Sequence, residues 1–360
     1  MRIAVLFLLA CGSAAAADYR ISTVATGLDH PWSLASLPDG RLLVTERSGR
    51  LRVIENGQLR PQAIAGVPAV LADGQGGLFE VLPDAHFADN QLLYLSFAAG
   101  SRQANSTNVV RARLAGEKLV EVKTIFVAKP LKKGTAHYGA RMLQLDDGSL
   151  LVGLGDGFAF REEAQNLRSH LGKIVRIDGD GSVPRDNPFV GRADVLPEIY
   201  SYGHRNVQGL AFDAQNHIVY AHEHGPRGGD EINRIEAGRN YGWPLITYGL
   251  DYTGAVISPF TQKPGLEQPL LQWTPSIAPA GMVLYRGDAF PQWRGSLVVS
   301  ALAAQQARRV PITDGKAGTQ EILFAELKKR LRDVRVAADG GLYLLTDYSA
   351  GEVLKVDPPR

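Results

Sequence analysis

The stretch LPDGRLLVTERSGRLRVI, residues 37–54, decides the fold that the sequence predicts. An Asp-Gly turn at residues 39–40 precedes the apolar run at 42–44, and a glycine at position 49 precedes the alternating run at 50–54. Turn residues between short runs of this kind are typical of antiparallel β-strands joined by tight connections. Residues 37–54 therefore predict one strand-and-turn unit.

The same unit recurs five more times, at spacings of roughly 45 to 80 residues, which indicates a degenerate repeat with insertions. The later units begin at Asp89-Asn90, Asp147-Gly148, Gln215-Asn216, Arg294-Gly295 and Asp339-Gly340. Six such units, each a sheet, predict an all-β fold: a six-bladed β-propeller with four-stranded antiparallel blades. A sandwich or a pair of barrels is the alternative, but each would need far fewer strands.

Composition agrees with a globular β protein. Hydrophobic residues make up 45% of the chain and charged residues 21%, enough for a large core. The 39 glycines and 20 prolines favour tight turns over long helices. Only residues 162–169 and 320–330 carry helical spacing, and both stretches are short. The net charge of +2 excludes electrostatic nucleic-acid binding as the main function.

The N-terminus predicts export. A basic start is followed by an apolar run at residues 3–11 and by small residues at 12–17, the layout of a secretory signal. We expect residues 1–17 to be a signal peptide and residues 18–360 a single propeller domain, periplasmic or secreted and without a membrane span. The alternative is a lipobox ending at Cys11, the chain's one cysteine, but cleavage there would leave an unusually short signal.

Several loops between the apolar runs carry candidate functional groups. Gln75 lies in the glycine-rich stretch GQGGL, which lacks the Gly-Lys-Ser/Thr of a phosphate loop. His137 precedes the third repeat unit, where a neutral imidazole could serve as a general base. Taken alone, each residue is more consistent with a structural role.

Two later loops suggest ligand and metal binding. Arg205 and Asn206 offer fixed donors for an anionic or carbonyl-bearing ligand, although a buried arginine paired with a carboxylate is an equal alternative. The stretch HEHGPRGGDEIN, residues 222–233, contains two histidines, but no third transition-metal ligand stands at a recognised spacing. Its exposed carbonyls and the acids Asp230 and Glu231 better suit calcium.

These segments, in this order, resemble the soluble sugar dehydrogenases that depend on pyrroloquinoline quinone (PQQ), specifically the aldose sugar dehydrogenase branch. The resemblance covers nearly all of the chain after residue 17. It is carried by HPWSLASLPDGRLLVTER from His30, GQGGL from Gly74, LGKIVRIDGDGSVPRDNPF from Leu171, YGHRNVQGL from Tyr202, EHGPRGGDEIN from Glu223, NYGWP from Asn240 and RLRDV from Arg330. The family fold is a six-bladed propeller, in agreement with the repeat count.

The resemblance implies a role for each candidate. His137 matches the base that takes the proton of the anomeric hydroxyl while the C1 hydride passes to the quinone. Arg205 and Asn206 match residues that contact the quinone carbonyls, with Arg205 stabilising the negative charge that develops there. Gln75 and Asp156 match residues that line the sugar site.

The resemblance also implies metal and cofactor ligands. The carbonyls of Gly225 and Pro226 match those that bind a calcium ion beside the cofactor. Glu231 and Tyr241 match the ligands of a second, structural calcium, and Asp230 is a plausible supporting contact. Two arginines, matching Arg330 and Arg332, hold the cofactor's carboxylates.

The sequence departs from the glucose-oxidising members at three positions. Ala303 replaces a lysine that contacts the cofactor, with Arg308, Arg309 or a nearby lysine as candidates to replace the lost charge. His224 replaces a glutamine and Ala136 replaces an acid. These changes favour a looser aldose range than glucose alone.

The sequence therefore predicts an exported quinoprotein that oxidises the C1 hydroxyl of aldoses to lactones, with PQQ and calcium as cofactors. It passes electrons to an external acceptor and is a monomer or homodimer. No GxGxxG opens a helix after a strand, so no nicotinamide fingerprint competes. The alternatives are a calcium-dependent lactonase or esterase propeller, and a non-catalytic sugar-binding propeller.

Overall fold

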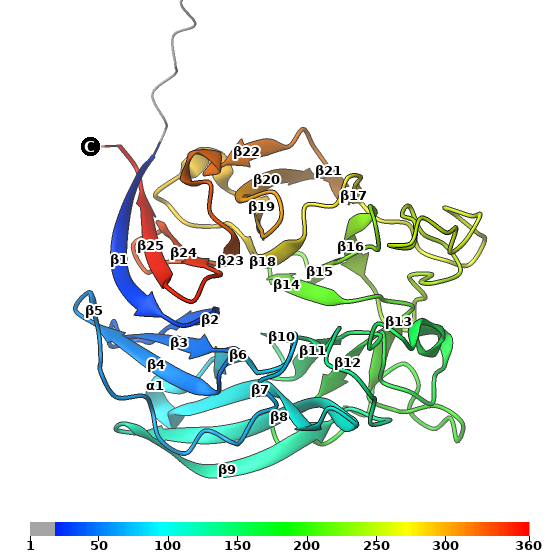
Figure 1. Ribbon diagram of the computed structural model, residues 1–360, viewed down its shortest axis with the longest axis horizontal. Coiled ribbons are helices and arrows are strands. Elements are labelled where there is room, and N and C mark those ends of the chain that lie inside the picture. The colour runs from blue at the N-terminus through cyan, green and yellow to red at the C-terminus, as the bar shows by residue number, and fades with distance from the viewer. Residues whose placement is uncertain (1–18, 360) are drawn as a thin grey trace, which may run out of the picture.

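Six antiparallel sheets are arranged around a central axis (Figure 1). The computed structural model describes residues 19–359, so the predicted signal peptide and Cys11 lie outside the described residues. Each sheet is one blade, and each has a path of four strands. The six-bladed β-propeller predicted from the turn units is confirmed.

Five blades are built from strands that follow one another along the chain. The first three of these comprise β2 (Pro31–Ser36), β3 (Leu42–Glu46), β4 (Arg50–Glu55) and β5 (Gln58–Leu59); β6 (Leu78–Pro83), β7 (Leu92–Ser101), β8 (Ala104–Ala115) and β9 (Lys118–Val127); and β10 (Gly139–Gln144), β11 (Leu150–Leu154), β12 (Lys173–Ile177) and β13 (Ile199–Tyr202). The next two comprise β14 (Val207–Asp213), β15 (Ile218–Glu223), β16 (Asp230–Ile235) and β17 (Leu271–Trp273); and β18 (Pro279–Leu284), β19 (Ser296–Ala301), β20 (Gln306–Thr313) and β21 (Lys316–Ala317), with β22 (Glu321–Leu323) also paired to β20.

The sixth blade joins the two ends of the chain. It contains β23 (Leu331–Val336), β24 (Leu342–Thr346) and β25 (Gly351–Asp357), and its outer strand is β1 (Arg20–Leu28). Figure 1 shows β1 in blue beside β25 in red. The register runs from Arg20 opposite Asp357 to Leu28 opposite Gly351. The ring is therefore closed by backbone hydrogen bonds between strands that are far apart in sequence.

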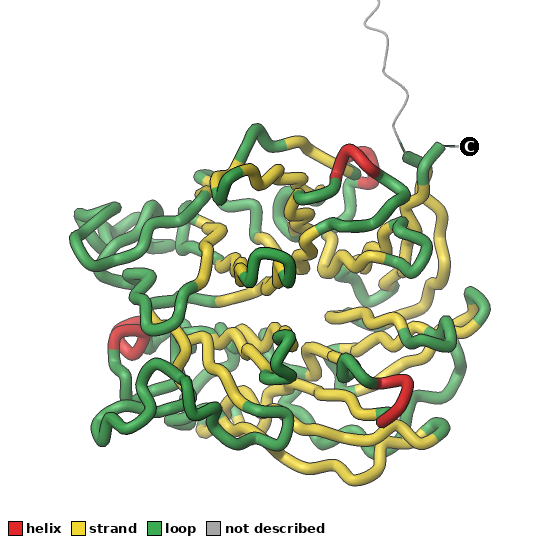
Figure 2. The backbone as a smooth tube through the Cα atoms, turned by 180° about the vertical axis from the view of Figure 1, so that it is seen from behind, coloured by secondary structure: helices red, strands yellow, loops and turns green. Residues whose placement is uncertain are grey.

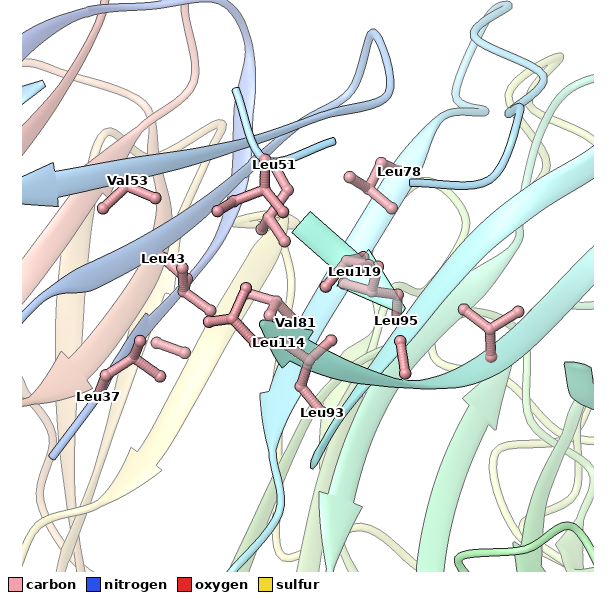
Figure 3. Packing of buried hydrophobic residues seen from close by; sticks show 14 of the residues in the cluster. Leu37, Leu43, Leu51, Val53, Leu78, Val81, Leu93, Leu95, Leu114 and Leu119 are labelled. Atoms are coloured by element: carbon pink, nitrogen blue, oxygen red, sulfur yellow. The ribbon is translucent and has the colours of Figure 1, made fainter. Parts of the chain in front are cut away.

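Every predicted turn unit leads into the second strand of a blade. These strands are β3, β7, β11, β15, β19 and β24. They are apolar because neighbouring blades pack against both of their faces; β11, for example, is buried at all five positions. Figure 3 shows one such interface, where Leu43 and Leu51 of one blade pack in the same cluster as Leu93 and Leu95 of the next.

Helices are few and short (Figure 2). They are α1 (Phe87–Asn90) and the 3-10 helices η1 (Arg161–Gln165), η2 (Pro291–Trp293) and η3 (Ala325–Leu327). Within residues 19–359, none has the length and apolar character that crossing a membrane requires. The helical turn expected at residues 162–169 corresponds to η1. A helix over residues 320–330 is wrong, because residues 321–323 pair with β20 and only 325–327 are helical.

The innermost strands lie next to one another around the axis: β2, β6, β10, β14, β18 and β23. Each has a register shift against its second strand close to its start. Because the first two strands of a blade are antiparallel, the start of the inner strand and the end of the second strand lie at the same end of the propeller. Loops from all six blades therefore converge there.

Candidate functional site

A cavity of about 310 Å³ lies at this end of the propeller. All six blades contribute to it, through residues at the starts of inner strands and the ends of second strands. Its lining comprises Trp32, Arg47, Gln75, Phe79, Tyr138, Gly139, Asn206, Gln208, His224, Ala278, Leu302, Arg330, Arg332 and Asp347. Four of the predicted site residues, Gln75, Asn206, Arg330 and Arg332, are among them.

His137 lies beside this cavity, immediately before Tyr138 and Gly139. Its backbone has a positive φ of 51°, an unusual conformation for a non-glycine residue. Its backbone N–H donates to Gln75 Oε1 over 2.8 Å, and its Nδ1 lies 2.7 Å from Asp156 Oδ1. The structure thus brings together Gln75, His137 and Asp156, three residues that the sequence placed in separate loops.

Asp156 is almost completely buried and is held on several sides. Trp243 Nε1 donates to its Oδ2 over 2.8 Å, and the Phe158 N–H donates to its Oδ1 over 2.8 Å. Burial by itself raises the pKa of Asp156, but the hydrogen bond and charge of His137 and the charge of Arg205 outweigh it, so the pKa lies below its ordinary value. Asp156 is therefore an ionised carboxylate that accepts a hydrogen bond from His137 Nδ1–H.

The His137 imidazole is neutral at neutral pH. Burial lowers its pKa below the ordinary value, and the charges of Arg205 and Lys132 act in the same direction, while Asp156 partly opposes them. With Nδ1–H engaged by Asp156, the lone pair is on Nε2. A neutral imidazole in a fixed tautomer can accept a proton.

Arg205 and Asn206 connect β13 to β14. Asn206 Oδ1 accepts from the Gly139 N–H over 3.1 Å at the edge of the cavity. The Arg205 guanidinium donates to the carbonyls of His224 over 3.1 Å and Gly225 over 2.5 Å. Within residues 19–359 the guanidinium forms no ion pair with a carboxylate, so the ion-paired alternative is not realised. Arg205 lies behind the main cavity and lines a smaller void next to it.

That smaller void has a volume of about 20 Å³. Gly225, Pro226, Glu231 and Tyr241, the four predicted calcium ligands, all line it, together with Glu223. Burial, together with the negative charge of Glu223, raises the pKa of Glu231 to about 8. Without a cation, Glu231 is therefore protonated at neutral pH. Carboxyl oxygens beside backbone carbonyls are the donor type that calcium prefers.

Several residues near the void are already engaged elsewhere. The Glu223 carboxylate accepts the Arg205 backbone N–H, and its Oε1 lies 2.9 Å from His204 Nδ1. The Tyr241 hydroxyl donates to the Arg234 carbonyl over 2.7 Å. The Asp230 carboxylate accepts backbone N–H groups from Gly225 over 2.9 Å, Ile277 over 2.8 Å and Ala278 over 2.9 Å. Asp230 therefore holds the loop that carries the Gly225 carbonyl in place through these hydrogen bonds.

Arg330 and Arg332 share one counterion, Asp347. Asp347 Oδ2 accepts from Arg330 Nη2 over 2.9 Å and from Arg332 Nη2 over 3.1 Å. Burial raises the pKa of Asp347, but the two arginines bring it below its ordinary value, so the group is ionised. Arg332 Nε and Asp347 Oδ1 are both buried without a hydrogen-bond partner among the described residues. Unpaired polar atoms at a cavity wall are suited to a polar ligand.

The three departures from the glucose-oxidising pattern can now be placed. Ala136 is half-buried directly before His137 and does not line the cavity. Leu302, and not Ala303, lines the cavity, and neither Arg308 nor Arg309 lines it. Arg309 instead pairs with Glu321 over 2.6 Å on the third strand of its blade.

His224 lines the cavity as a neutral group. Burial lowers its pKa to about 3, and its Nε2 contacts the Pro279 carbonyl over 2.7 Å. The residues at 19–359 contain no group of three His, Cys, Asp or Glu side chains arranged for a metal.

Sequence reasoning missed three residues of the site. Asp347 and Arg47 follow second strands, as Asp156 and His224 do, but only the closed ring shows that these ends meet. Glu223 begins the motif EHGPRGGDEIN, and its position before the expected calcium carbonyls was an available signal.

Residues 28–355 match the family model described as Glucose / Sorbosone dehydrogenase. The aldose sugar dehydrogenase YliI of Escherichia coli (strain K12) is 39% identical over 351 residues, 96% of this chain and 94% of that protein. A crystal structure of a glucose dehydrogenase is 44% identical, with a TM-score of 0.91 over 93% of this chain and 99% of the other. The PQQ-bound aldose sugar dehydrogenase (Adh) from Streptomyces coelicolor is 30% identical, with a TM-score of 0.77 over 96% and 100% of the two chains. The chain belongs to the glucose/sorbosone dehydrogenase family.

Proposed function

We propose that this protein is a PQQ-dependent dehydrogenase that oxidises the C1 hydroxyl of aldose sugars to lactones. The observation that carries the proposal is a neutral, carboxylate-held imidazole beside a cavity walled by arginines. The names of its relatives support the same chemistry, since they include an aldose sugar dehydrogenase and a PQQ-bound homologue.

The cavity suits a cofactor that carries several carboxylates. Arg330 and Arg332 would hold these groups, because buried carboxylates need charged hydrogen-bond partners. Arg332 Nε, a buried donor without a partner, is available for one of them. When bound, PQQ supplies the acceptor for the hydride of C1, and an external acceptor then takes the electrons. Asn206 at the edge and Arg205 behind it would lie beside the quinone carbonyls.

His137 acts on the sugar in this proposal. Its Nε2 accepts the proton of the anomeric hydroxyl, while Asp156 keeps Nδ1 protonated and stabilises the imidazolium that results. The Gln75 side chain fixes the histidine backbone and lines the sugar site. The C1–O single bond becomes the lactone carbonyl as C1 loses its hydride.

We further propose calcium at the small void. The carbonyls of Gly225 and Pro226 would hold the ion beside the cofactor, and Glu231 with a Tyr241 carbonyl would hold a structural ion. Glu223 adds a second buried carboxylate. A divalent cation would offset the repulsion between the two acids.

Removing calcium is expected to lower both thermal stability and activity, because a ligand that binds only the folded state stabilises it by mass action. At calcium concentrations of about 100 times Kd the contribution is roughly 2.7 kcal/mol. Melting curves with calcium and with chelator measure the difference. Glu231→Gln should reduce the difference in melting temperature between the calcium and chelator samples, whereas Glu236→Gln, at an exposed residue, should leave that difference unchanged. Identical curves with and without calcium would contradict the proposed ions.

Export to the periplasm or the medium belongs to the same proposal, with residues 1–17 removed as a signal peptide. Its support is the sequence layout alone.

The product tests the proposed chemistry. With an aldose, PQQ, calcium and an electron acceptor, we expect the sugar's lactone, detected by NMR, in equal amounts with the reduced acceptor. Oxidation at C6, or acceptor reduction without a lactone, would contradict the assignment of C1.

The carboxylates on the inner strands are relevant to the alternative of a calcium-dependent hydrolase. A calcium-dependent lactonase would need carboxylates or amides that converge on an axial ion. Here Glu80 and Asp333 on inner strands are paired with arginines: Arg141 lies 2.9 Å from Glu80, and Arg335 lies 2.5 Å from Glu80 and 3.0 Å from Asp333. These carboxylates are neutralised by protein cations, which favours the dehydrogenase.

A further inference from the structure

We propose that Arg47 is a further cofactor-binding residue, which adds a third positive charge to the cavity wall. This inference rests on the proposed function. Arg47 directly follows β3, at the position that Asp347 occupies after β24 in the neighbouring blade. It lines the same cavity as Arg330 and Arg332.

The Arg47 backbone is fixed at both ends. Its N–H donates to the His30 carbonyl over 3.1 Å, and its own carbonyl accepts from the Leu78 N–H over 3.2 Å. Gly77 permits this approach, since a Cβ there would lie 2.2 Å from the Arg47 carbonyl oxygen. The side chain is anchored too, because Arg47 Nη2 donates to the Gly74 carbonyl. The guanidinium is thus held next to Gln75 at the cavity.

The charge of Arg47 has no carboxylate partner among the described residues. Its neighbours Arg50 and Arg52 both pair with Glu46, the residue that precedes Arg47. Arg47 Nε is in addition buried with no hydrogen-bond partner within residues 19–359. A buried, unpaired guanidinium N–H is costly unless a ligand accepts it. The acceptor would come from the cavity that Arg47 lines.

The charges around the cavity favour an anionic ligand. Three arginines and one ionised aspartate line it, which leaves a net charge of +2, and His224 is neutral. A cofactor with three carboxylates is therefore better matched with Arg47 than without it, since the arginines at 330 and 332 already share Asp347. We infer that Arg47 donates to one cofactor carboxylate or carbonyl.

Equilibrium titration of PQQ into the calcium-loaded apo-protein, followed by quenching of tryptophan fluorescence, tests this without any turnover. Arg47→Gln should raise Kd by roughly tenfold or more, the usual worth of a charged hydrogen bond. Arg47→Met, which keeps the length of the side chain, should do the same. Arg50→Gln is the matched control: it removes a charge three residues away that is already paired with Glu46 and Asp29.

The outcomes separate this inference from the proposed function. Equal Kd values for wild type, Arg47→Met and Arg50→Gln would overturn the role of Arg47 and leave the function standing. A wild-type protein that does not bind PQQ would overturn both. A rise in Kd for Arg47→Gln and Arg47→Met but not for Arg50→Gln, with an unchanged melting temperature, is the result that the inference requires.

Discussion

Replacing His137 by alanine is expected to lower kcat for aldose oxidation by about 10²- to 10⁴-fold, the usual contribution of a general base. The Kd for PQQ should stay nearly unchanged, because His137 is not among the residues that line the cofactor cavity. Dye-reduction kinetics and a PQQ titration on the same preparation measure both quantities. Wild-type turnover in the variant would exclude His137 as the base.

Asp156→Asn provides a matched variant with a different readout. Asp156 raises the pKa of His137, whereas burial, Arg205 and Lys132 lower it. Removing the carboxylate should therefore lower that pKa further and move the acid limb of the kcat/KM profile to lower pH. The maximum rate should also fall, because the imidazolium loses its partner. A limb that moves to higher pH would contradict the assigned pair.

Replacing Arg330 and Arg332 together by alanine is expected to raise the Kd for PQQ by roughly 10²- to 10⁴-fold, if each charged hydrogen bond contributes about 1.5–3 kcal/mol. The change also leaves Asp347 buried without a counterion and repelling the cofactor. Titration of the apo-protein with PQQ measures the effect.

The same double variant should melt at a lower temperature than wild type, since it strands the Asp347 charge. Adding Asp347→Asn should restore much of the stability but little of the affinity. An unchanged PQQ titration in the double variant would remove both arginines from the cofactor site.

The fold was predictable because its repeat is local. Each predicted turn unit leads into the second strand of a blade, and residues 37–54 also contain the third strand. The apolar character of the second strands follows from burial on both faces. The pairing of β1 with β25 could not be predicted from the sequence. The two strands are more than 300 positions apart, and the local sequence pattern of a strand does not indicate which strand it pairs with. Residues 321–323 show the opposite error, in which pairing with β20 overrides a weak helical spacing.

The site could be predicted only in part, because some of its residues are recognised only from the contacts they make in the folded protein. Motifs pointed to His137, Asn206 and Arg332, whose chemistry is visible in single loops. Asp347 is recognised as a site residue only from its pairing with Arg330 and Arg332, and Arg47 only from the cavity that it lines. The geometry adds what the sequence lacks: which charges meet, and which of them remain unpaired.

Reconstitution of the purified apo-protein tests the central claim most directly. PQQ and calcium are added back, and reduction of an artificial dye is followed across a panel of aldoses. We predict reduction that requires the quinone, calcium and an aldose together. Bound PQQ with no dye reduction by any aldose would contradict the claim.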